Sequence, residues 1–115
     1  MRVVVTGGRA FSDRSLVETA LSSLPADTVI INGGCSGADA LCSEVAEYLG
    51  MHVRTFPANW KRYGKKAGPI RNGQMLRGAD LLLAFPGGKG TANCIMQARI
   101  KGVPVEYAAD KRKLV

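Results

Sequence analysis

The stretch from residue 81 to residue 91 constrains this chain most, because it joins a strand pattern to a glycine loop and a helix pattern. Its first five residues, Leu-Leu-Leu-Ala-Phe, form the apolar run typical of a strand buried on both faces. Pro-Gly-Gly-Lys-Gly-Thr follows directly, ahead of a helical segment. Such a loop lets a ligand approach the backbone, and the free N–H groups of the helix favour phosphate. It matches neither a Walker A loop nor Gly-x-Gly-x-x-Gly, so taken alone it also fits a plain turn.

Two further glycine loops follow strand patterns elsewhere in the chain. The β-branched run at residues 2–6 ends in the loop 7–9, and the run at 28–32 leads into the loop 33–39. The second of these loops precedes a helical stripe that ends near Gly50. Ligands of parallel α/β sheets bind beyond the carboxyl ends of the strands. We therefore expect the three loops to meet in one phosphate-binding site.

Strand and helix patterns alternate along the whole chain. Strands are expected at residues 2–6, 28–32, 52–56, 81–85 and 104–107. Four helices are expected. The first starts after Ser12 or Asp13 and ends at Pro25, and the second runs over 38–49. The third begins around Pro69 and closes at Gly78, and the fourth ends before Gly102. This alternation predicts an α/β fold, a single Rossmann-like three-layer domain over residues 1–115 with a mainly parallel sheet, in which 110–115 form a flexible basic tail.

Composition places the chain among soluble globular domains, with 46% hydrophobic and 22% charged residues in 115. The sequence has no long apolar run and no signal-peptide pattern, so we expect a cytoplasmic protein without a membrane partner. The three cysteines lack a CxxC pair and His52 is the only histidine, which supports neither a disulfide framework nor a zinc site. No metal site is expected, and Mg²⁺ would enter only with the phosphates of a ligand.

The basic residues are concentrated in one block. The formal net charge is +7, and no acidic residue occurs between Glu47 and Asp80. The basic block consists of Arg54, Lys61, Arg62, Lys65, Lys66, Arg71 and Arg77. A block of one sign is often only a solvated surface, but it also concentrates the electric field on an anion. Within it, residues 57–68 are expected to form a long irregular loop carrying Trp60 and Tyr63, and such loops are often functional.

Five spaced motifs cover nearly the whole chain. They are Val-Thr-Gly-Gly-Arg at 5–9, Asn-Gly-Gly-Cys-Ser-Gly-Ala-Asp at 32–39, Phe-Pro-Ala-Asn-Trp at 56–60, Gly-Pro-Ile-Arg-Asn at 68–72 and Ala-Phe-Pro-Gly-Gly-Lys-Gly-Thr at 84–91. In this order they resemble the YspA-type, cpYpsA-related branch of the SLOG superfamily. That superfamily includes the LOG phosphoribohydrolases, the DNA-binding DprA proteins and sensor domains for NAD-derived signals. The resemblance implies a Rossmann-like sheet, a nucleotide-derived ligand and a homo-oligomer, dimeric or tetrameric.

The resemblance also bears on catalysis. LOG enzymes cleave the base from a nucleoside monophosphate and carry Pro-Gly-Gly-x-Gly-Thr-x-x-Glu with an upstream arginine. Arg71 matches the arginine, but Cys94, preceded by Asn93, stands at the glutamate position. A carboxylate is needed there to stabilise a developing oxocarbenium or to orient water. The catalytic candidates are therefore Arg71 and Asp39, although contact to a ribose or closure of its own helix N-terminus is the better-supported role of Asp39.

The expected ligand contacts come from the three loops and from the Arg-Asn pair after Pro69. They are Gly7, Gly8, Arg9, Gly33, Gly34, Ser36, Gly37, Asp39, Arg71, Asn72, Pro86, Gly87, Gly88, Lys89, Gly90 and Thr91. Phosphate contact is best supported for Gly87, Gly88, Gly90 and Thr91. Arg71 suits phosphate because a guanidinium binds it with two parallel hydrogen bonds. Lys89 fits a solvated turn lysine equally well.

Some side chains fit two interpretations. Trp60 and Tyr63 either stack on a base or anchor their loop to the core, and the second is commoner for a lone tryptophan. Cys94 on its helix is expected to pack as a small hydrophobe rather than act as a nucleophile. Cys35, beside a helix N-terminus, either has a lowered pKa or is simply a small tolerated residue, the favoured reading.

Three functions follow in order of support. The first is binding of a nucleotide-derived, phosphate-bearing small molecule, such as NAD, ADP-ribose, a nucleoside phosphate or a cyclic signal, by a sensor or sequestering protein. The second is a LOG-like N-glycosidase or phosphoribohydrolase. The third is nucleic-acid binding, suggested by the charge and by the kinship with DprA. It ranks last because aromatic residues for base stacking make up only 6% of the chain.

Overall fold

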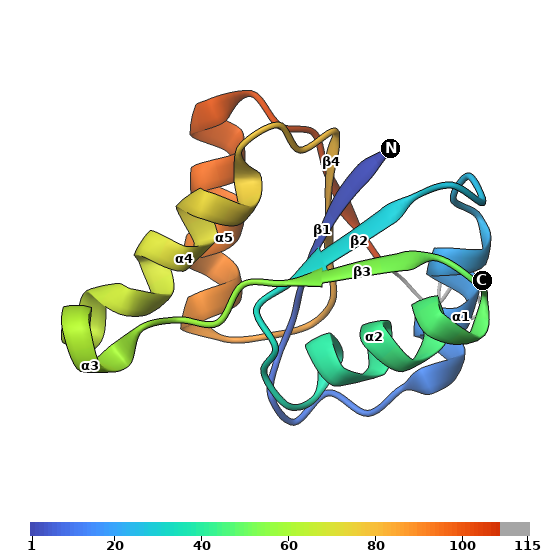
Figure 1. The fold of residues 1–115 in the computed structure, drawn as a ribbon, viewed down its shortest axis with the longest axis horizontal. Coiled ribbons are helices and arrows are strands. Elements are labelled where there is room, and N and C mark those ends of the chain that lie inside the picture. Colours follow the sequence, from blue (N-terminus) through green and yellow to red (C-terminus); the bar gives the residue numbers. More distant parts are fainter. Residues whose placement is uncertain (109–115) are drawn as a thin grey trace, which may run out of the picture.

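The computed structural model describes residues 1–108 and contains a five-stranded sheet in the order β3-β2-β1-β4-β5 (Figure 1). The strands are β1 (Arg2–Thr6), β2 (Val29–Asn32), β3 (His52–Thr55), β4 (Leu81–Ala84) and β5 (Val105–Tyr107). All neighbouring strands are parallel, which confirms the expected α/β fold. Strand order reverses between β1 and β4, the kind of switch point at which α/β sheets bind ligands. The predicted basic tail at 110–115 lies outside the described residues.

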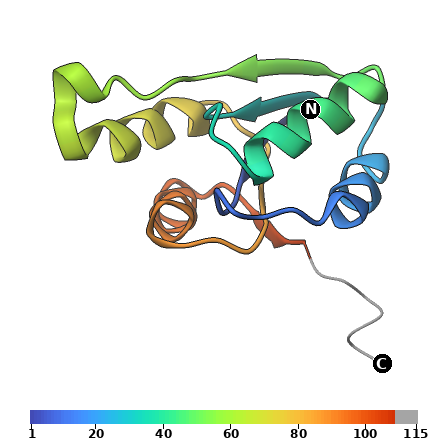
Figure 2. The same cartoon turned by 90° about the horizontal axis from the view of Figure 1, so that it is seen from below.

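Helices cover both faces of the sheet and make three layers (Figure 2). The helices α1 (Arg14–Ser22) and α2 (Ala38–Tyr48) pack on one face, and α4 (Ala67–Leu76) and α5 (Lys89–Lys101) on the other. Side chains alternate between the two cores, as the pleat of a strand requires. Val3 and Val5 belong to the core under α1 and α2, whereas Val4 belongs to the core under α4 and α5. This burial on both faces explains the unbroken apolar runs in the sequence.

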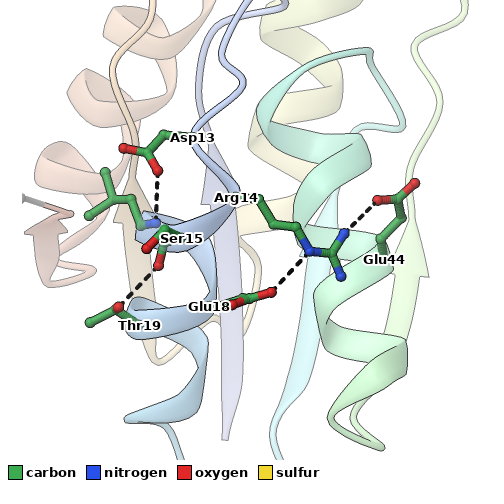
Figure 3. Close-up of polar contacts among 7 residues, drawn as sticks. Asp13, Arg14, Ser15, Glu18, Thr19 and Glu44 are labelled. Atoms are coloured by element: carbon green, nitrogen blue, oxygen red, sulfur yellow. Dashed lines mark hydrogen bonds and ion pairs between the residues drawn. The ribbon is translucent and has the colours of Figure 1, made fainter.

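The N-terminus of α1 is capped by Asp13, which decides between the two predicted caps. Its Oδ1 accepts a hydrogen bond from the backbone N–H of Leu16 at 3.1 Å (Figure 3). Arg14 pairs with Glu18 one turn on in α1 at 2.9 Å, and it joins α1 to α2 through an ion pair with Glu44 at 3.0 Å. These pairs are exposed, so they add little stability. The helix ends at Ser22, before the expected stop at Pro25.

The expected irregular loop at 57–68 is the main error of the sequence-based fold. The structure instead has a short helix α3 (Trp60–Tyr63), a 3-10 turn (Gly64–Lys66) and the first turn of α4. Asn59 caps α3, because its Oδ1 accepts the backbone N–H of Arg62 at 3.1 Å. Gly64 ends α3 with a positive φ of 56°. Figure 1 shows α3 beyond the carboxyl end of β3, where it extends the side of the molecule that carries the glycine loops.

The other helix signals are confirmed. Pro69 is the third residue of α4, within the first turn, where a proline removes no intrahelical hydrogen bond. Gly50, Gly78 and Gly102 follow helices and have φ values of 77°, 70° and 76°. Within residues 1–108, no helix has the length and apolar character that a membrane crossing requires.

Candidate ligand-binding site

A cavity of about 630 Å³ lies beyond the carboxyl ends of the strands, between the glycine loops and the α3–α4 segment. The predicted contact residues that line it are Gly7, Arg9, Asp39, Arg71, Asn72, Gly88, Lys89, Gly90 and Thr91. Those that do not are Gly8, Gly33, Gly34, Ser36, Gly37, Pro86 and Gly87. The sequence therefore located the cavity, but it did not separate residues that face the cavity from residues that support it.

The three glycine loops meet as expected, and backbone hydrogen bonds hold them together. The N–H of Gly8 donates to the carbonyl of Pro86 at 2.8 Å, and the carbonyl of Gly8 accepts the N–H of Ala38 at 3.1 Å. Ser36 adds a hydrogen bond from its hydroxyl to the carbonyl of Arg9 at 3.2 Å. The loop after β1 thus lies between the other two loops and bonds to both.

Several glycines of the three loops allow this close approach. A Cβ on Gly37 would meet the carbonyl oxygen of Gly8, and one on Gly7 would meet the Cβ of Ala38 at 2.5 Å. A Cβ on Gly87 would meet Thr91 Oγ1. Gly88 and Gly90 differ from these, because a Cβ there would have no atom within 4 Å. Both line the cavity, so their missing side chains leave the backbone open to a ligand.

The N-terminus of α5 faces the cavity without a protein cap. Gly88 is the N-cap residue and supplies no side-chain hydrogen bond. The N–H groups of Lys89, Gly90 and Thr91 fall in the first turn, where a helix offers no acceptor of its own. The positive end of the helix dipole adds to their attraction for an anion. This turn is the most direct phosphate site in the cavity.

Arg71 is held in the cavity wall by backbone carbonyls. Its Nη1 donates to the carbonyl of Gly33 at 3.1 Å and to that of Phe56 at 3.4 Å, and its Nε donates to Asn72 Oδ1 at 3.1 Å. Gly33 makes this position possible, because a Cβ there would overlap the guanidinium. The three hydrogen bonds use Nη1 and Nε, which leaves Nη2 for a ligand.

A chain of side-chain amides joins α4 to the first turns of α5. Asn72 Nδ2 donates to Asn93 Oδ1 at 3.2 Å and to the carbonyl of Gly90 at 3.4 Å. Gln97 Nε2 donates to the same Asn93 oxygen at 2.8 Å and to the carbonyl of Pro69 at 2.9 Å. The network fixes the first turns of α5 relative to Arg71.

Asp39 is buried and closes the loop that precedes its helix. Its Oδ2 accepts the N–H groups of Gly33 at 3.1 Å and of Cys35 at 3.2 Å. This differs from the expected closure of the helix N-terminus, because α2 is capped by Gly37 without a side-chain bond. Burial raises the pKa of Asp39, and the two N–H groups and Arg71 offset only part of that rise.

Substitution of Asp39 by alanine is expected to destabilise the fold by about 2 kcal/mol, since two loop N–H groups lose their acceptor. Asp39→Asn keeps an acceptor oxygen and should cost less.

The stability of the protein should also depend on pH through Asp39. The pKa of Asp39 in the native state lies above the ordinary 3.8, so unfolded chains lose this proton first as pH rises. The contribution of Asp39 to stability therefore falls between pH 3.8 and the raised pKa and is constant above it. Urea unfolding from pH 3.5 to 7 measures this slope, which Asp39→Asn should lack. An alanine variant as stable as wild type would contradict the assignment.

The structure shows where the side chains with two interpretations lie. Cys94 is fully buried and burial raises its pKa to about 11, which confirms packing rather than a nucleophilic role. Cys35 is half-buried and lines the cavity. Trp60 and Tyr63 are 50% and 38% exposed, so the expectation that they anchor the segment to the core is wrong. Trp60 lines the cavity and Tyr63 does not.

The structure adds residues to the cavity that were not among the expected ligand contacts. They are Val5, Thr6, Cys35, Trp60, Lys65, Gly68, Pro69, Met75 and Asn93. The available signals were weak: Lys65 lay in the basic block, and Asn93 lay next to the position that carries the glutamate in LOG enzymes. Val5, Thr6 and Met75 carried only strand and helix patterns, which do not show which core residues reach a cavity.

The cavity is electropositive. Arg9, Lys65, Arg71 and Lys89 line it, and Asp39 is the one carboxylate among its lining residues within 1–108. The ion pairs within residues 1–108 are both formed by Arg14, which lies outside the basic block and does not line the cavity. Since none of the four cations forms an ion pair within residues 1–108, they favour an anionic ligand. The described residues contain no group of three His, Cys, Asp or Glu side chains suited to a metal ion.

Comparisons with known proteins agree with this geometry. The family model of the "YspA, cpYpsA-related SLOG family" matches residues 1–63. The Gene 61 protein of Mycobacterium phage D29 is 38% identical over 122 residues, which cover 96% of this chain and 98% of that protein.

Two solved structures share the fold. TM1055 superposes with a TM-score of 0.72 at 23% identity, over 90% of this chain and 71% of that one. DNA processing protein A (DprA) from Streptococcus pneumoniae superposes with a TM-score of 0.78 at 20% identity, over 92% of this chain and 49% of that one. At these identities the likeness concerns the fold alone. On the family model and the phage relative, this chain belongs to the YspA, cpYpsA-related SLOG family.

Proposed function

We propose that this protein binds a nucleotide-derived, phosphate-bearing small molecule in the cavity and acts as a sensor or sequestering protein. The observation that carries the proposal is the uncapped first turn of α5, where Gly88 and Gly90 leave the backbone open toward an electropositive cavity. Membership of the SLOG family supports a nucleotide-derived ligand. NAD, ADP-ribose, nucleoside phosphates and cyclic relatives all fit this class.

Size and charge agree with such a ligand. A volume of about 630 Å³ falls within the range of about 300–1,000 Å³ that small-molecule sites occupy. The phosphate is assigned to the N–H groups of the α5 first turn, with Arg71 Nη2 and Lys89 as cationic partners. Lys65 and Arg9 remain for a second phosphate or a ribose. Mg²⁺ would arrive only with the phosphates. A cytoplasmic location and a dimeric or tetrameric assembly belong to the same proposal.

Arg71→Ala is expected to weaken phosphate-ligand binding by roughly 10- to 100-fold, because a hydrogen bond to a charged group is lost from a partly buried site. Calorimetric titration of AMP and ADP-ribose into wild type and variant measures this change. Arg77→Ala is the matched control, since Arg77 belongs to the basic block but does not line the cavity. Equal losses in both variants would show that only overall charge matters, and an unchanged Arg71 variant would remove Arg71 from the site.

An N-glycosidase of the LOG type is the second candidate, and the position of the Asp39 carboxylate in the cavity lining favours it. Asp39 lines the cavity with Arg71, and its two hydrogen bonds to the loop N–H groups both use Oδ2. Cys94 is fully buried and does not line the cavity, so it supplies no acid–base group. Incubation with AMP followed by chromatography for free adenine tests this candidate. Release that Asp39→Asn abolishes would establish it, and intact AMP after binding would exclude it.

Nucleic-acid binding is the third candidate. DNA processing protein A shares the fold, and α3 with its 3-10 turn exposes Lys61, Arg62, Lys65 and Lys66. Contacts of these lysines and arginines to backbone phosphates would make the affinity for single-stranded DNA fall steeply with salt. A flat salt response, with nucleotide binding retained, would exclude this candidate.

A further inference from the structure

The most unusual side chain at the cavity is Trp60, the only tryptophan of the chain. It lies at the start of α3, lines the cavity and is 50% exposed. A large aromatic side chain left half in water gains little from the core, because the free energy of burial scales with the apolar area removed from water. Its position therefore calls for a contact outside the folded chain.

The local structure holds Trp60 in place without burying it. Asn59 caps α3 through the N–H of Arg62 at 3.1 Å, and Gly64 ends the helix with a φ of 56°. On the other side, the Cη2 edge of the indole lies against Gly68, where a Cβ would stand only 3.3 Å away. An indole fixed at both its helix and its ring edge needs little reordering to meet a ligand.

Trp60 also belongs to an apolar part of the cavity lining. Gly68, Pro69 and Met75 line the same α3–α4 wall, which carries Lys65, Arg71 and Asn72 as well, whereas the first turn of α5 supplies the open N–H groups. The α3–α4 wall thus offers apolar surface for a planar group, and the α5 turn offers N–H groups for phosphate. A nucleotide has the matching division, with a planar base at one end and phosphate at the other.

We propose that Trp60 is the base-stacking platform of the site and that the α3–α4 wall is a nucleobase subsite. This inference rests on the proposed function and adds to it that the ligand must carry a planar ring. Stacking on an aromatic side chain tolerates any base, because every base presents a π face. The subsite therefore selects for the presence of a base rather than for its identity.

Binding of base-bearing and base-free probes to the purified protein tests this inference. AMP and ADP-ribose carry adenine, and ribose 5-phosphate is the base-free probe contained in both. Trp60→Ala is expected to weaken binding of AMP and ADP-ribose by roughly 5- to 100-fold, the range for loss of one stacked base. Trp60→Ala should leave the affinity for ribose 5-phosphate within about twofold, since that probe has no base to stack on the indole. Trp60→Phe should restore most of the difference.

Fluorescence supplies an independent measurement, because emission from the single tryptophan reports on this position alone. AMP should change the Trp60 emission of wild type, and ribose 5-phosphate at saturation should change it far less. Tyr63→Ala is the matched control, since Tyr63 lies on the same short helix and is 38% exposed but does not line the cavity. Circular dichroism checks that each variant is folded.

The outcomes separate this inference from the proposed function. If Trp60→Ala leaves AMP binding unchanged, or weakens AMP and ribose 5-phosphate equally, the base subsite is wrong while phosphate binding stands. If wild type binds none of the three probes and also no NAD, nucleoside phosphate or cyclic relative, the proposed function fails and the subsite fails with it. A change of oligomeric state in Trp60→Ala without a change in AMP affinity would assign the exposed indole to a contact between copies of the chain and overturn the inference.

Discussion

Replacement of Gly90 by aspartate is expected to abolish binding of phosphate ligands and at the same time to raise the melting temperature. Gly90 is the second residue of α5, and a Cβ there would have no atom within 4 Å. The new carboxylate would lie beside the free N–H groups and the positive end of the helix dipole, which stabilises a helix by about 0.3–1 kcal/mol. It would also place a negative charge where the phosphate is proposed to bind, so we expect affinity to fall by at least about 100-fold.

The control for this prediction is Gly90→Asn, which has nearly the same size but no charge. Calorimetry with AMP and thermal unfolding without ligand measure the two effects separately. The asparagine variant should lose less affinity and gain less stability than the aspartate variant. If the aspartate variant bound AMP as tightly as wild type, the phosphate would have to lie away from the first turn of α5.

Gly37→Ala is expected to lower the free energy of unfolding by at least about 3 kcal/mol. Gly37 has φ 74° and ψ −124°, a backbone conformation that is almost restricted to glycine. Its Cβ would also meet the carbonyl oxygen of Gly8 and the backbone of Arg9. Since these contacts are backbone atoms, no side chain can turn away, and the loops after β1 and β2 would have to separate.

Gly50→Ala is the comparison at a glycine that has a positive φ but no neighbouring loop. Gly50 has a similar φ of 77°, but a Cβ there would have no neighbour within 4 Å. We therefore expect it to cost only about 1–2 kcal/mol, the ordinary penalty for a left-handed residue. Urea unfolding of both variants measures the difference. Equal losses would show that the close approach of the two loops contributes nothing to stability.

The fold followed from local patterns because each pattern has a direct physical cause. The apolar runs before the glycine loops became strands buried on both faces, as Val3, Val4 and Val5 show. Gly50, Gly78 and Gly102 terminate helices because each occupies a positive φ that other residues avoid. The convergence of the three loops followed from parallel strands, since their carboxyl ends lie at one edge of the sheet.

The errors had two sources, a local cap that was overlooked and contacts between distant residues. The cap from Asn59 orders α3, but its effect was hidden in a segment rich in charge and glycine. The sequence alone does not distinguish glycines that allow loops to pack from glycines that face a ligand. Only the fold separates Gly37, which faces another loop, from Gly88 and Gly90, which face the cavity. The exposure of Trp60 likewise depends on how α3 lies against Gly68 of α4.

The most direct test of ligand binding is equilibrium dialysis of the purified protein against a mixture of nucleoside phosphates, NAD, ADP-ribose and cyclic relatives, with both chambers analysed by mass spectrometry. We expect wild type to retain at least one intact nucleotide-derived compound and Gly90→Asp to retain none. Retention by neither protein, or equal retention by both, would contradict phosphate binding at the first turn of α5.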